Sequence, residues 1–433
     1  MYNPPRTPGS TGPAITSVDA VEILDCRGEP TLRVGVTLAN HEVVWADVPA
    51  GRSTGTHEAS EVRDGGPRYG GRGVRHAIRN VVEEIGPRIL GMDVVGQRLI
   101  DAAMIELDGT PNKGRLGANA IVGVSLAVAR AAAQWTGMPL YRYLNINAHV
   151  LPVPLVNLIN GGKHASNDLE FQEVCIFPIG ADTFVEAMEI AHSVNSELRE
   201  IVIKKYGKLA ANVGDEGGFA PPVRGVVEAL GCLEQAVSRS GCAEKIVYGL
   251  DCAATHFYDA KTSTYSLEGK KLTTDELLAF YASLLAKFPI ASIEDPFAED
   301  DVAGFVSATR DLGIQIVGDD FFCTNSERLR DGIRAGSANA LLWKINQIGT
   351  LSEALDAADL AYRSGYGVMV SERSGETEDP IIADMTVGLN AGQIKTGAPV
   401  RGERTAKYNR LLEIERELGA SATYAGKNFK VPF

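Results

Sequence analysis

The sequence predicts an α/β protein in which a (β/α)8 barrel forms the C-terminal part and a smaller α+β domain precedes it. Short apolar runs rich in β-branched residues alternate with helical segments between residues 290 and 395. The runs lack polar alternation, which is typical of strands buried on both faces of a parallel sheet. They recur about every 25 residues, which fits the repeat of a (β/α) barrel. At 433 residues, the chain exceeds the usual size of one core, so we expect two domains.

The N-terminal elements predict the smaller domain. Residues 15–25 and 31–48 alternate enough to be strands, and a turn near Asn40 interrupts the second. Helical segments follow at residues 73–90, 97–107 and 117–135. An antiparallel sheet followed by helices indicates an α+β domain, which we expect over residues 15–143.

Prolines mark both edges of this domain. Residues 1–14 hold several prolines and glycines and are expected to form a flexible tail. The prolines after Leu151 mark the start of the barrel domain, expected over residues 150–433. Its clearest strands end on charged side chains, at residues 290–295, 314–320, 340–344, 366–373 and 393–395, and helices are expected at 325–335 and 350–364. Because the carboxyl ends of barrel strands share one face, where active sites lie, these charges should converge.

The composition excludes several classes of function. Apolar residues make up 45% of the chain and charged residues 22%, as in an ordinary globular protein. The net charge of −13 argues against non-specific binding to nucleic acid or to an anionic membrane. The six cysteines have no metal-binding spacing, and we find neither a signal-peptide pattern nor a long uncharged apolar span. We therefore expect reduced thiols and a cytoplasmic location.

Three acids at successive strand ends predict a metal site. Asp251 ends the apolar run 245–251, and Glu294 and Asp319 end the next two runs. Oxygen ligands of this kind suit Mg²⁺ better than zinc. The alternative is that each acid caps a helix or pairs with a neighbouring lysine.

Two lysines at strand ends predict proton chemistry. Lys344 follows an otherwise apolar strand, and burial beside cations and a metal would lower its pKa and let it act as a base. Lys395 occupies a similar position and would add to that effect. A metal would stabilise the charge formed when a proton is removed next to a carboxylate. The alternative is a structural lysine paired with an acid.

Four loops or loop-adjacent positions carry further candidates. Residues 49–55 have hydroxyls that suit a metal or phosphate, although most such runs are only turns. His164 lies in a glycine-rich loop, where a histidine is usually just solvated. Glu216 lies in a rigid turn and is either a turn former or catalytic, while Glu173 opens an apolar run.

Long motifs in the chain resemble those of the enolase family. They begin as Gly117-Ala-Asn-Ala-Ile-Val-Gly, Asn212-Val-Gly-Asp-Glu-Gly-Gly, Ser292-Ile-Glu-Asp-Pro-Phe, Lys344-Ile-Asn-Gln-Ile-Gly, Ser374-Gly-Glu-Thr-Glu-Asp and Gln393-Ile-Lys-Thr-Gly. The resemblance covers residues 15–419. It implies an enolase-type barrel and a Mg²⁺-dependent enzyme that dehydrates 2-phosphoglycerate to phosphoenolpyruvate.

The resemblance also implies roles for individual residues. The ligands of a first Mg²⁺ would be Asp251, Glu294 and Asp319. Lys344 would be the base that takes the α-proton, and Lys395 would bind the substrate carboxylate.

The remaining roles concern the leaving group, the phosphate and a second Mg²⁺. Glu216, assisted by Glu173, would be the acid for the departing 3-hydroxyl. The phosphate would be held by Arg373 and Ser374. Ser53 would bind the second Mg²⁺ from a mobile loop, and His164 would be its partner on another closing loop.

Two departures from the family pattern concern the substrate pocket. Glu372 stands where enolases have histidine, and Arg52 appears in the loop where they have Ser-Gly-Ala-Ser-Thr-Gly. A carboxylate beside a phosphate site would repel an anionic substrate unless a cation compensates. We expect Arg52 to pair with Glu372 or to hold a further anion. The alternative is drift at two tolerant positions.

These departures favour a rebuilt pocket, as in carboxyphosphonoenolpyruvate synthase of phosphinate antibiotic biosynthesis. Glu372 would then belong to the catalytic set and Arg52 to the substrate-binding set. Glycolytic enolase is the alternative, and a non-catalytic enolase-like binding protein or a racemase-like member are others. The resemblance further implies small anionic phosphate or phosphonate substrates and a homo-oligomer, either a dimer or an octamer.

Overall fold

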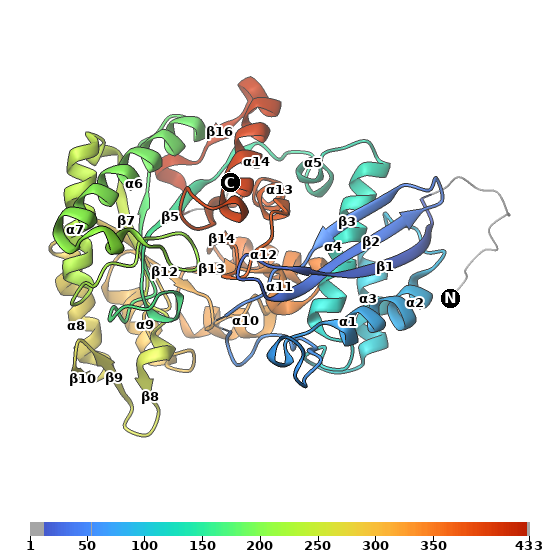
Figure 1. Cartoon of the computed structure of the whole chain (residues 1–433), viewed down its shortest axis with the longest axis horizontal. Helices are drawn as coiled ribbons and strands as arrows, with labels where there is room; N and C mark the ends of the chain where they lie inside the picture. The colour runs from blue at the N-terminus through green and yellow to red at the C-terminus, as the bar shows by residue number, and fades with distance from the viewer. Residues whose placement is uncertain (1–12, 53, 431–433) are drawn as a thin grey trace.

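The computed structural model describes residues 13–52 and 54–430 as two parts side by side. Figure 1 shows the N-terminal domain, in blue to cyan, beside the barrel, in green to red. Ser53 and most of the expected N-terminal tail lie outside the described residues. Within the described ranges, no helix combines the length and apolar character needed to cross a membrane.

The N-terminal domain contains an antiparallel sheet in the order β1-β2-β3. Its strands are β1 (Ile15–Leu24), β2 (Pro30–Leu38) and β3 (Val43–Asp47). The expected interruption of the second strand lies between β2 and β3, where His41 has a φ of 65°. Helix α4 (Ala118–Trp135) packs on this sheet. A Cβ atom at Gly123 would lie 2.6 Å from Val34, so the glycine allows this close approach.

The helical segment expected over 73–90 is broken. It divides into α1 (Arg75–Arg79), a π-helical turn and α2 (Gly86–Ile89). Pro87 has no backbone N–H to donate within a regular helix, which accounts for the break. Two more helices complete the region, α3 (Gln97–Asp108) and α5 (Leu140–Leu144).

Eight strands close the barrel in the order β11-β12-β13-β14-β15-β5-β6-β7. Their bounds are β5 (Val153–Asn160), β6 (Glu173–Phe177), β7 (Val247–Asp251), β11 (Ile290–Glu294), β12 (Gln315–Gly318), β13 (Ala340–Trp343), β14 (Gly367–Ser371) and β15 (Gly392–Lys395). The α/β barrel fold is thus confirmed, but the expectation of an entirely parallel sheet is wrong. Strand β6 is antiparallel to both neighbours. The loop from β5 to β6 holds only a 3-10 turn and no crossover helix, so the chain returns in the opposite direction.

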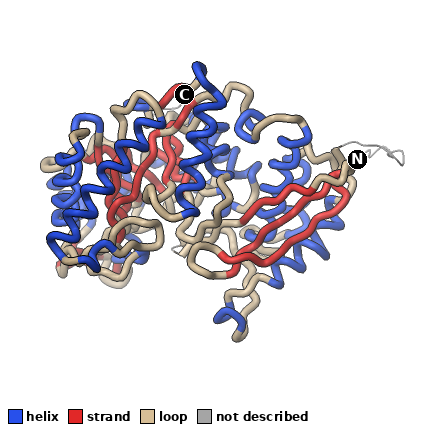
Figure 2. The backbone as a smooth tube through the Cα atoms, turned by 45° about the horizontal axis from the view of Figure 1, so that its top comes forward, coloured by secondary structure: helices blue, strands red, loops and turns tan. Residues whose placement is uncertain are grey.

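Helices surround the barrel strands (Figure 2). They are α6 (Phe184–Tyr206), α7 (Val226–Ser240), α8 (Thr274–Leu285), α9 (Val302–Asp311), α10 (Ser326–Ala335), α11 (Ile345–Ile348), α12 (Leu351–Arg363), α13 (Ile381–Gly388) and α14 (Gly402–Leu418). Side chains of Asn325 and Thr350 cap α10 and α12, which fixes the two starts where the sequence predicts them. Short strands form two small sheets, β8 (Tyr258–Asp259), β9 (Thr264–Leu267) and β10 (Lys270–Leu272), and β4 (Val150–Leu151) with β16 (Thr423–Tyr424).

The barrel interior changes from apolar to charged along its axis. A separate apolar cluster includes Leu155, Phe177 and Met369, and Phe429 from the C-terminal segment joins it. The rings of Phe177 and Phe429 lie 4.8 Å apart. A buried amide pair, Gln315 with Gln393, lies at the same level of the barrel, because Gln393 is the register partner of Met369. The charged side chains follow at the carboxyl ends of the strands, where Asp251, Glu294 and Lys395 end β7, β11 and β15.

Candidate active site

The acids at the ends of β7 and β11 lie together in the barrel mouth. Asp251 and Glu294 are register partners on adjacent parallel strands and are almost fully buried. The Nζ atom of Lys395 lies 2.7 Å from Asp251 Oδ2 and 2.9 Å from Glu294 Oε1. Asp319 follows β12 and is bound by Lys344, whose Nζ lies 2.5 Å from Asp319 Oδ2. The structure thus brings the three expected metal ligands and the two expected lysines into one cluster.

The pKa of Lys344 shifts opposite to the sequence expectation. Burial of the ammonium group lowers the pKa, but the charge of Asp319 outweighs burial, and the pKa lies above its usual value. Burial and the neighbouring Asp251 raise the pKa of Glu294 well above its usual value. A divalent cation at these carboxylates would favour the ionised form of Glu294 and compete with Lys344 for Asp319.

The donor set fits a hard cation. The three carboxylates offer only oxygen ligands, which is the chemistry that Mg²⁺ prefers. Asp319 also lies in a group with Asp295 and Asp320, whose ligand atoms are within 4.8 Å of one another. The oxygens of Asp295 already accept hydrogen bonds from the backbone N–H groups of Asp319 and Asp320, both at 2.8 Å. Asp295 therefore orients the turn that carries Asp319, a role that the sequence interpretation missed.

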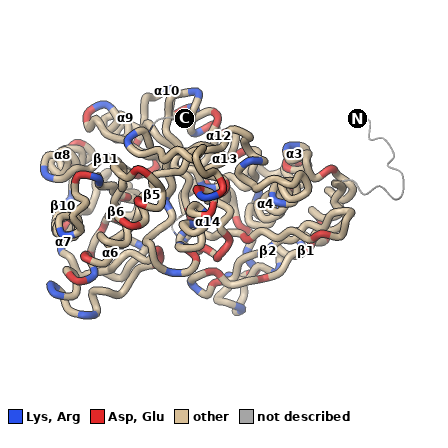
Figure 3. The backbone as a smooth tube through the Cα atoms, turned by 90° about the horizontal axis from the view of Figure 1, so that it is seen from above, with Lys and Arg blue, Asp and Glu red and all other residues tan. Residues whose placement is uncertain are grey.

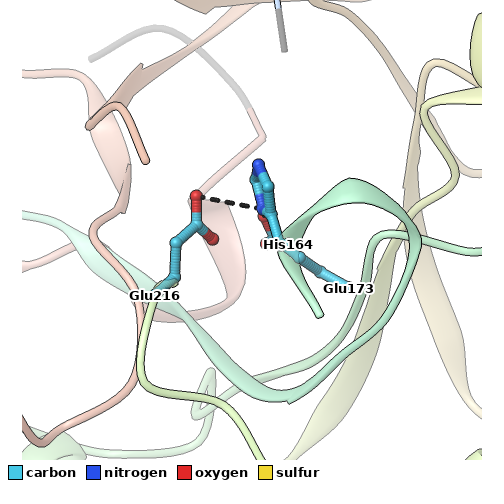
Figure 4. Close-up of side chains that lie close together, drawn as sticks. All are labelled: His164, Glu173 and Glu216. Carbon is cyan, nitrogen blue, oxygen red and sulfur yellow. Dashed lines mark ion pairs between the residues drawn. The ribbon is translucent and has the colours of Figure 1, made fainter. Parts of the chain in front are cut away.

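A second cluster combines His164, Glu173 and Glu216 (Figure 4). All three side chains are buried, and His164 Nδ1 lies 3.4 Å from Glu216 Oε1 and 3.7 Å from Glu173 Oε1. Burial lowers the pKa of His164, but the two carboxylates outweigh burial and raise it to about 10. His164 is therefore an imidazolium rather than a solvated loop residue.

Of the two carboxyl groups in this cluster, Glu173 binds a proton more readily than Glu216. Burial and the charge of Glu216 raise the pKa of Glu173 to about 7. Burial also opposes the ionisation of Glu216, but His164 outweighs it and holds the pKa of Glu216 well below its usual value. Asn157 donates a hydrogen bond of 3.1 Å to Glu216 Oε2. The pair can thus store one proton beside the cavity.

Arg373, expected at the phosphate, is bound from the N-terminal domain. Its guanidinium donates two hydrogen bonds of 3.0 Å to the carboxylate of Glu58 and one of 2.9 Å to Asn346. Ser374 Oγ accepts a hydrogen bond of 2.9 Å from the backbone N–H of Arg52. Glu58 was missed from the sequence because nothing in its own segment indicates the partner. A phosphate reaching Arg373 would compete with Glu58.

The expected pairing of Arg52 with Glu372 is wrong. Arg52 pairs instead with Asp215 in the loop of Glu216, at 2.7 Å between NH1 and Oδ2. Glu372 pairs with Arg404, which lies at the start of α14 and is fully buried. The side chain of Arg52 is 54% exposed and lies outside that buried pair. Position 404 supplies the compensating cation that the sequence interpretation sought at position 52.

Both parts of the chain match models of known domains. Residues 15–144 match the family model described as the enolase N-terminal domain, and residues 148–433 match the enolase C-terminal TIM barrel domain. The chain belongs to the enolase family. It is 58% identical over 420 residues to the enolase of Methanocaldococcus jannaschii, which covers 97% of this chain and 99% of the relative. It is 57% identical over 424 residues to the enolase of Thermococcus gammatolerans, with coverage of 97% and 98%.

Membership in the enolase family makes the chain a carbon–oxygen lyase of the enolase superfamily, with Mg²⁺ as its cofactor. The relatives named above are enolases, and the comparison does not support the carboxyphosphonoenolpyruvate synthase expected from Glu372 and Arg52. It favours the alternative, dehydration of 2-phosphoglycerate. Basic and acidic residues are intermixed over both domains (Figure 3). In this acidic chain, Lys344, Lys395 and Arg373 place three cationic side chains around one cavity.

Proposed function

We propose that the chain catalyses the dehydration of 2-phosphoglycerate to phosphoenolpyruvate, as in glycolysis. One observation carries the proposal: the expected base Lys344 and the acid pair Glu173 and Glu216 line the same cavity. A dehydration that removes a proton from one carbon and hydroxide from the next requires both functions within one substrate length.

The cavity also provides groups for the two anionic ends of the substrate. Lys395 is suited to the carboxylate, and Arg373 with Ser374 is suited to the phosphate. Asp251, Glu294 and Asp319 would hold a Mg²⁺ ion, whose charge stabilises the negative charge that develops on the substrate carboxylate. Binding would exchange existing ion pairs for new ones, because each of these cations already contacts a carboxylate.

The chain's own residues would move the two protons. The neutral amine of Lys344 takes the proton from C2, and the electron pair forms the C2–C3 double bond. The C3–O bond breaks, and the hydroxide leaves as water with the proton of the Glu173 and Glu216 pair. Lys344 must lose its ammonium proton first, so Asp319 has to be released from the ion pair seen here.

The test is direct. Purified protein with Mg²⁺ and 2-phosphoglycerate is followed for phosphoenolpyruvate by its ultraviolet absorbance. We expect rapid formation of phosphoenolpyruvate that chelation abolishes and renewed Mg²⁺ restores. Absence of product from folded protein with Mg²⁺ bound would refute the proposed dehydration.

A second candidate is the carboxyphosphonoenolpyruvate synthase reaction. The observation in its favour is Glu372, a buried carboxyl at a position where the resemblance to enolases implies histidine. The same assay with phosphonoformate added distinguishes the two. A phosphonate-bearing product that forms only with that donor would favour the synthase, and phosphoenolpyruvate formation unaffected by the donor would favour the dehydratase.

A further inference from the structure

The two carboxyl oxygens of Glu372 have different surroundings. Glu372 directly follows β14 and is 2% exposed. Its Oε2 accepts hydrogen bonds from Arg404 and, at 3.3 Å, from Thr396 Oγ1. Its Oε1 is buried and has no hydrogen-bonding partner among the described residues. A buried polar atom without a partner is costly, so such an atom in a cavity wall indicates a site for a ligand group.

Arg404 binds one of the two carboxyl oxygens of Glu372. Its guanidinium donates hydrogen bonds to the carbonyl oxygens of Arg373, Ser374 and Asp215, at 2.8, 2.9 and 3.1 Å. The side chain is fully buried, and three backbone groups from two loops hold it in place. Arg404 therefore binds Oε2, and Oε1 is the oxygen without a partner on a side chain that lines a cavity together with Glu216 and Lys395.

The cations of the cavity are paired with other acids. Lys344 contacts Asp319, Lys395 contacts Asp251 and Glu294, and Arg373 contacts Glu58. His164 lies beside Glu216 and Glu173. A partner for Oε1 is therefore best supplied by the ligand. Phosphate and carboxylate groups have mainly acceptor oxygens, whereas a hydroxyl group both donates and accepts. Burial, with the charge of Glu216 adding to it and Arg404 opposing it, raises the pKa of Glu372 well above its usual value, and a hydroxyl suits either protonation state.

We infer that Glu372 is a substrate-binding residue whose Oε1 forms a hydrogen bond with the 3-hydroxyl of the bound phosphorylated hydroxy acid, and that Arg404 is its positioning residue. This inference rests on the proposed function for the identity of the ligand. It makes Glu372 a determinant of specificity: a ligand without the hydroxyl leaves Oε1 unpaired, and a site built around a hydroxyl discriminates against such a ligand.

The test compares two ligands that differ only at this group. Calorimetric binding of 2-phosphoglycerate and of 2-phospholactate, which has a methyl group in place of the hydroxymethyl group, is measured with Mg²⁺ in a Lys344→Met background to prevent turnover. We expect 2-phosphoglycerate to bind roughly tenfold more tightly. Glu372→Ala should reduce that ratio by weakening 2-phosphoglycerate alone, and Arg404→Lys should reduce it in the same way.

Glu403→Gln is the matched control, because Glu403 is a buried carboxylate that also contacts Arg404, at 3.4 Å, but does not line the cavity. We expect this variant to keep the affinity ratio. Equal affinities in the Lys344→Met protein itself, or equal weakening of both ligands by Glu372→Ala, would overturn the inference. The first outcome does not depend on whether the Glu372 variant folds. The binding test and the test of the proposed dehydration can fail independently, because the dehydration is tested by product formation in the unmodified protein.

Discussion

The two ends of the barrel differ in what their side chains do. At one end, Phe177, Met369 and Phe429 pack in an apolar cluster. At the other, acids and cations are buried in pairs, such as Lys344 with Asp319 and Lys395 with Glu294. Apolar packing stabilises a fold directly, whereas buried ion pairs repay their desolvation only in part. The comparison teaches that the apolar end supports stability and that the charged end is retained for chemistry. Substitutions at the apolar end should therefore lower stability, and substitutions at the charged end should lower activity.

The largest expected effect is the loss of the base at the charged end. Lys344→Met removes the only amine that the proposed scheme uses to take the C2 proton. We expect kcat for phosphoenolpyruvate formation to fall by at least about 10³-fold, with circular dichroism showing folded protein. A folded variant that keeps a tenth of the activity would exclude Lys344 as the base.

A core substitution at the apolar end should act in the opposite way. Phe429 is 2% exposed, and its ring lies tilted against that of Phe177, with the ring centroids 4.8 Å apart. Phe429→Ala should lower the free energy of unfolding by about 3–5 kcal/mol while leaving kcat/KM unchanged at temperatures where the variant is folded. Denaturant titration measures the first quantity and the absorbance assay the second.

Leu209→Ala is the control for Phe429→Ala, because Leu209 is 80% exposed. Its unfolding free energy should stay within about 0.5 kcal/mol of the original. A Phe429→Ala protein that loses activity but no stability would reverse the assignment of the two ends.

The pH dependence at the charged end should follow Glu173. Its folded-state pKa, about 7, lies above its usual value. A raised carboxyl pKa contributes stability that is complete below about pH 4.5 and is lost as the pH rises through 7. If the reaction needs this proton, kcat/KM should fall about tenfold per pH unit above 7.

Glu173→Gln sharpens this prediction, because an amide keeps the shape of the side chain but does not titrate. The residual activity of this variant should lose the fall that begins near pH 7. An unchanged alkaline limb in Glu173→Gln would assign that limb to another group.

The smallest expected effect concerns the ion pair at the rim of the charged end. Arg52 and Asp215 are 2.7 Å apart, but the arginine side chain is half exposed. Arg52→Ala should cost less than about 1 kcal/mol of stability and change KM by no more than about threefold. A loss of kcat comparable with that of Lys344→Met would show that the pair has a catalytic role.

The sequence predicts the barrel well because each buried strand appears as a local apolar run. Runs such as residues 340–344 and 366–373 lie on observed strands, and the side-chain caps Asn325 and Thr350 place two helix starts. The antiparallel β6 could not be predicted in the same way, because an apolar run has no direction. Only the absence of a helix between β5 and β6 indicates it.

The sequence predicts which residues form the site better than it predicts which of their charges pair. Asp251, Glu294 and Asp319 follow strands, so the topology brings them together. The pairs of Glu58 with Arg373 and of Arg404 with Glu372 join positions far apart in the chain. Such pairs depend on how the domains and α14 pack, which the sequence does not show. For this reason the cation for Glu372 was expected at Arg52 and not at Arg404.

The central claim is that Lys344 takes the proton from C2, whereas the Glu173 and Glu216 pair supplies the proton for the leaving hydroxide. Proton NMR in D₂O measures exchange of the C2 hydrogen of 2-phosphoglycerate with Mg²⁺ present, alongside phosphoenolpyruvate formation. We predict that Glu216→Gln retains exchange while product formation collapses, and that Lys344→Met loses both. Exchange that persists in Lys344→Met, or disappears in folded Glu216→Gln with substrate bound, would contradict this division.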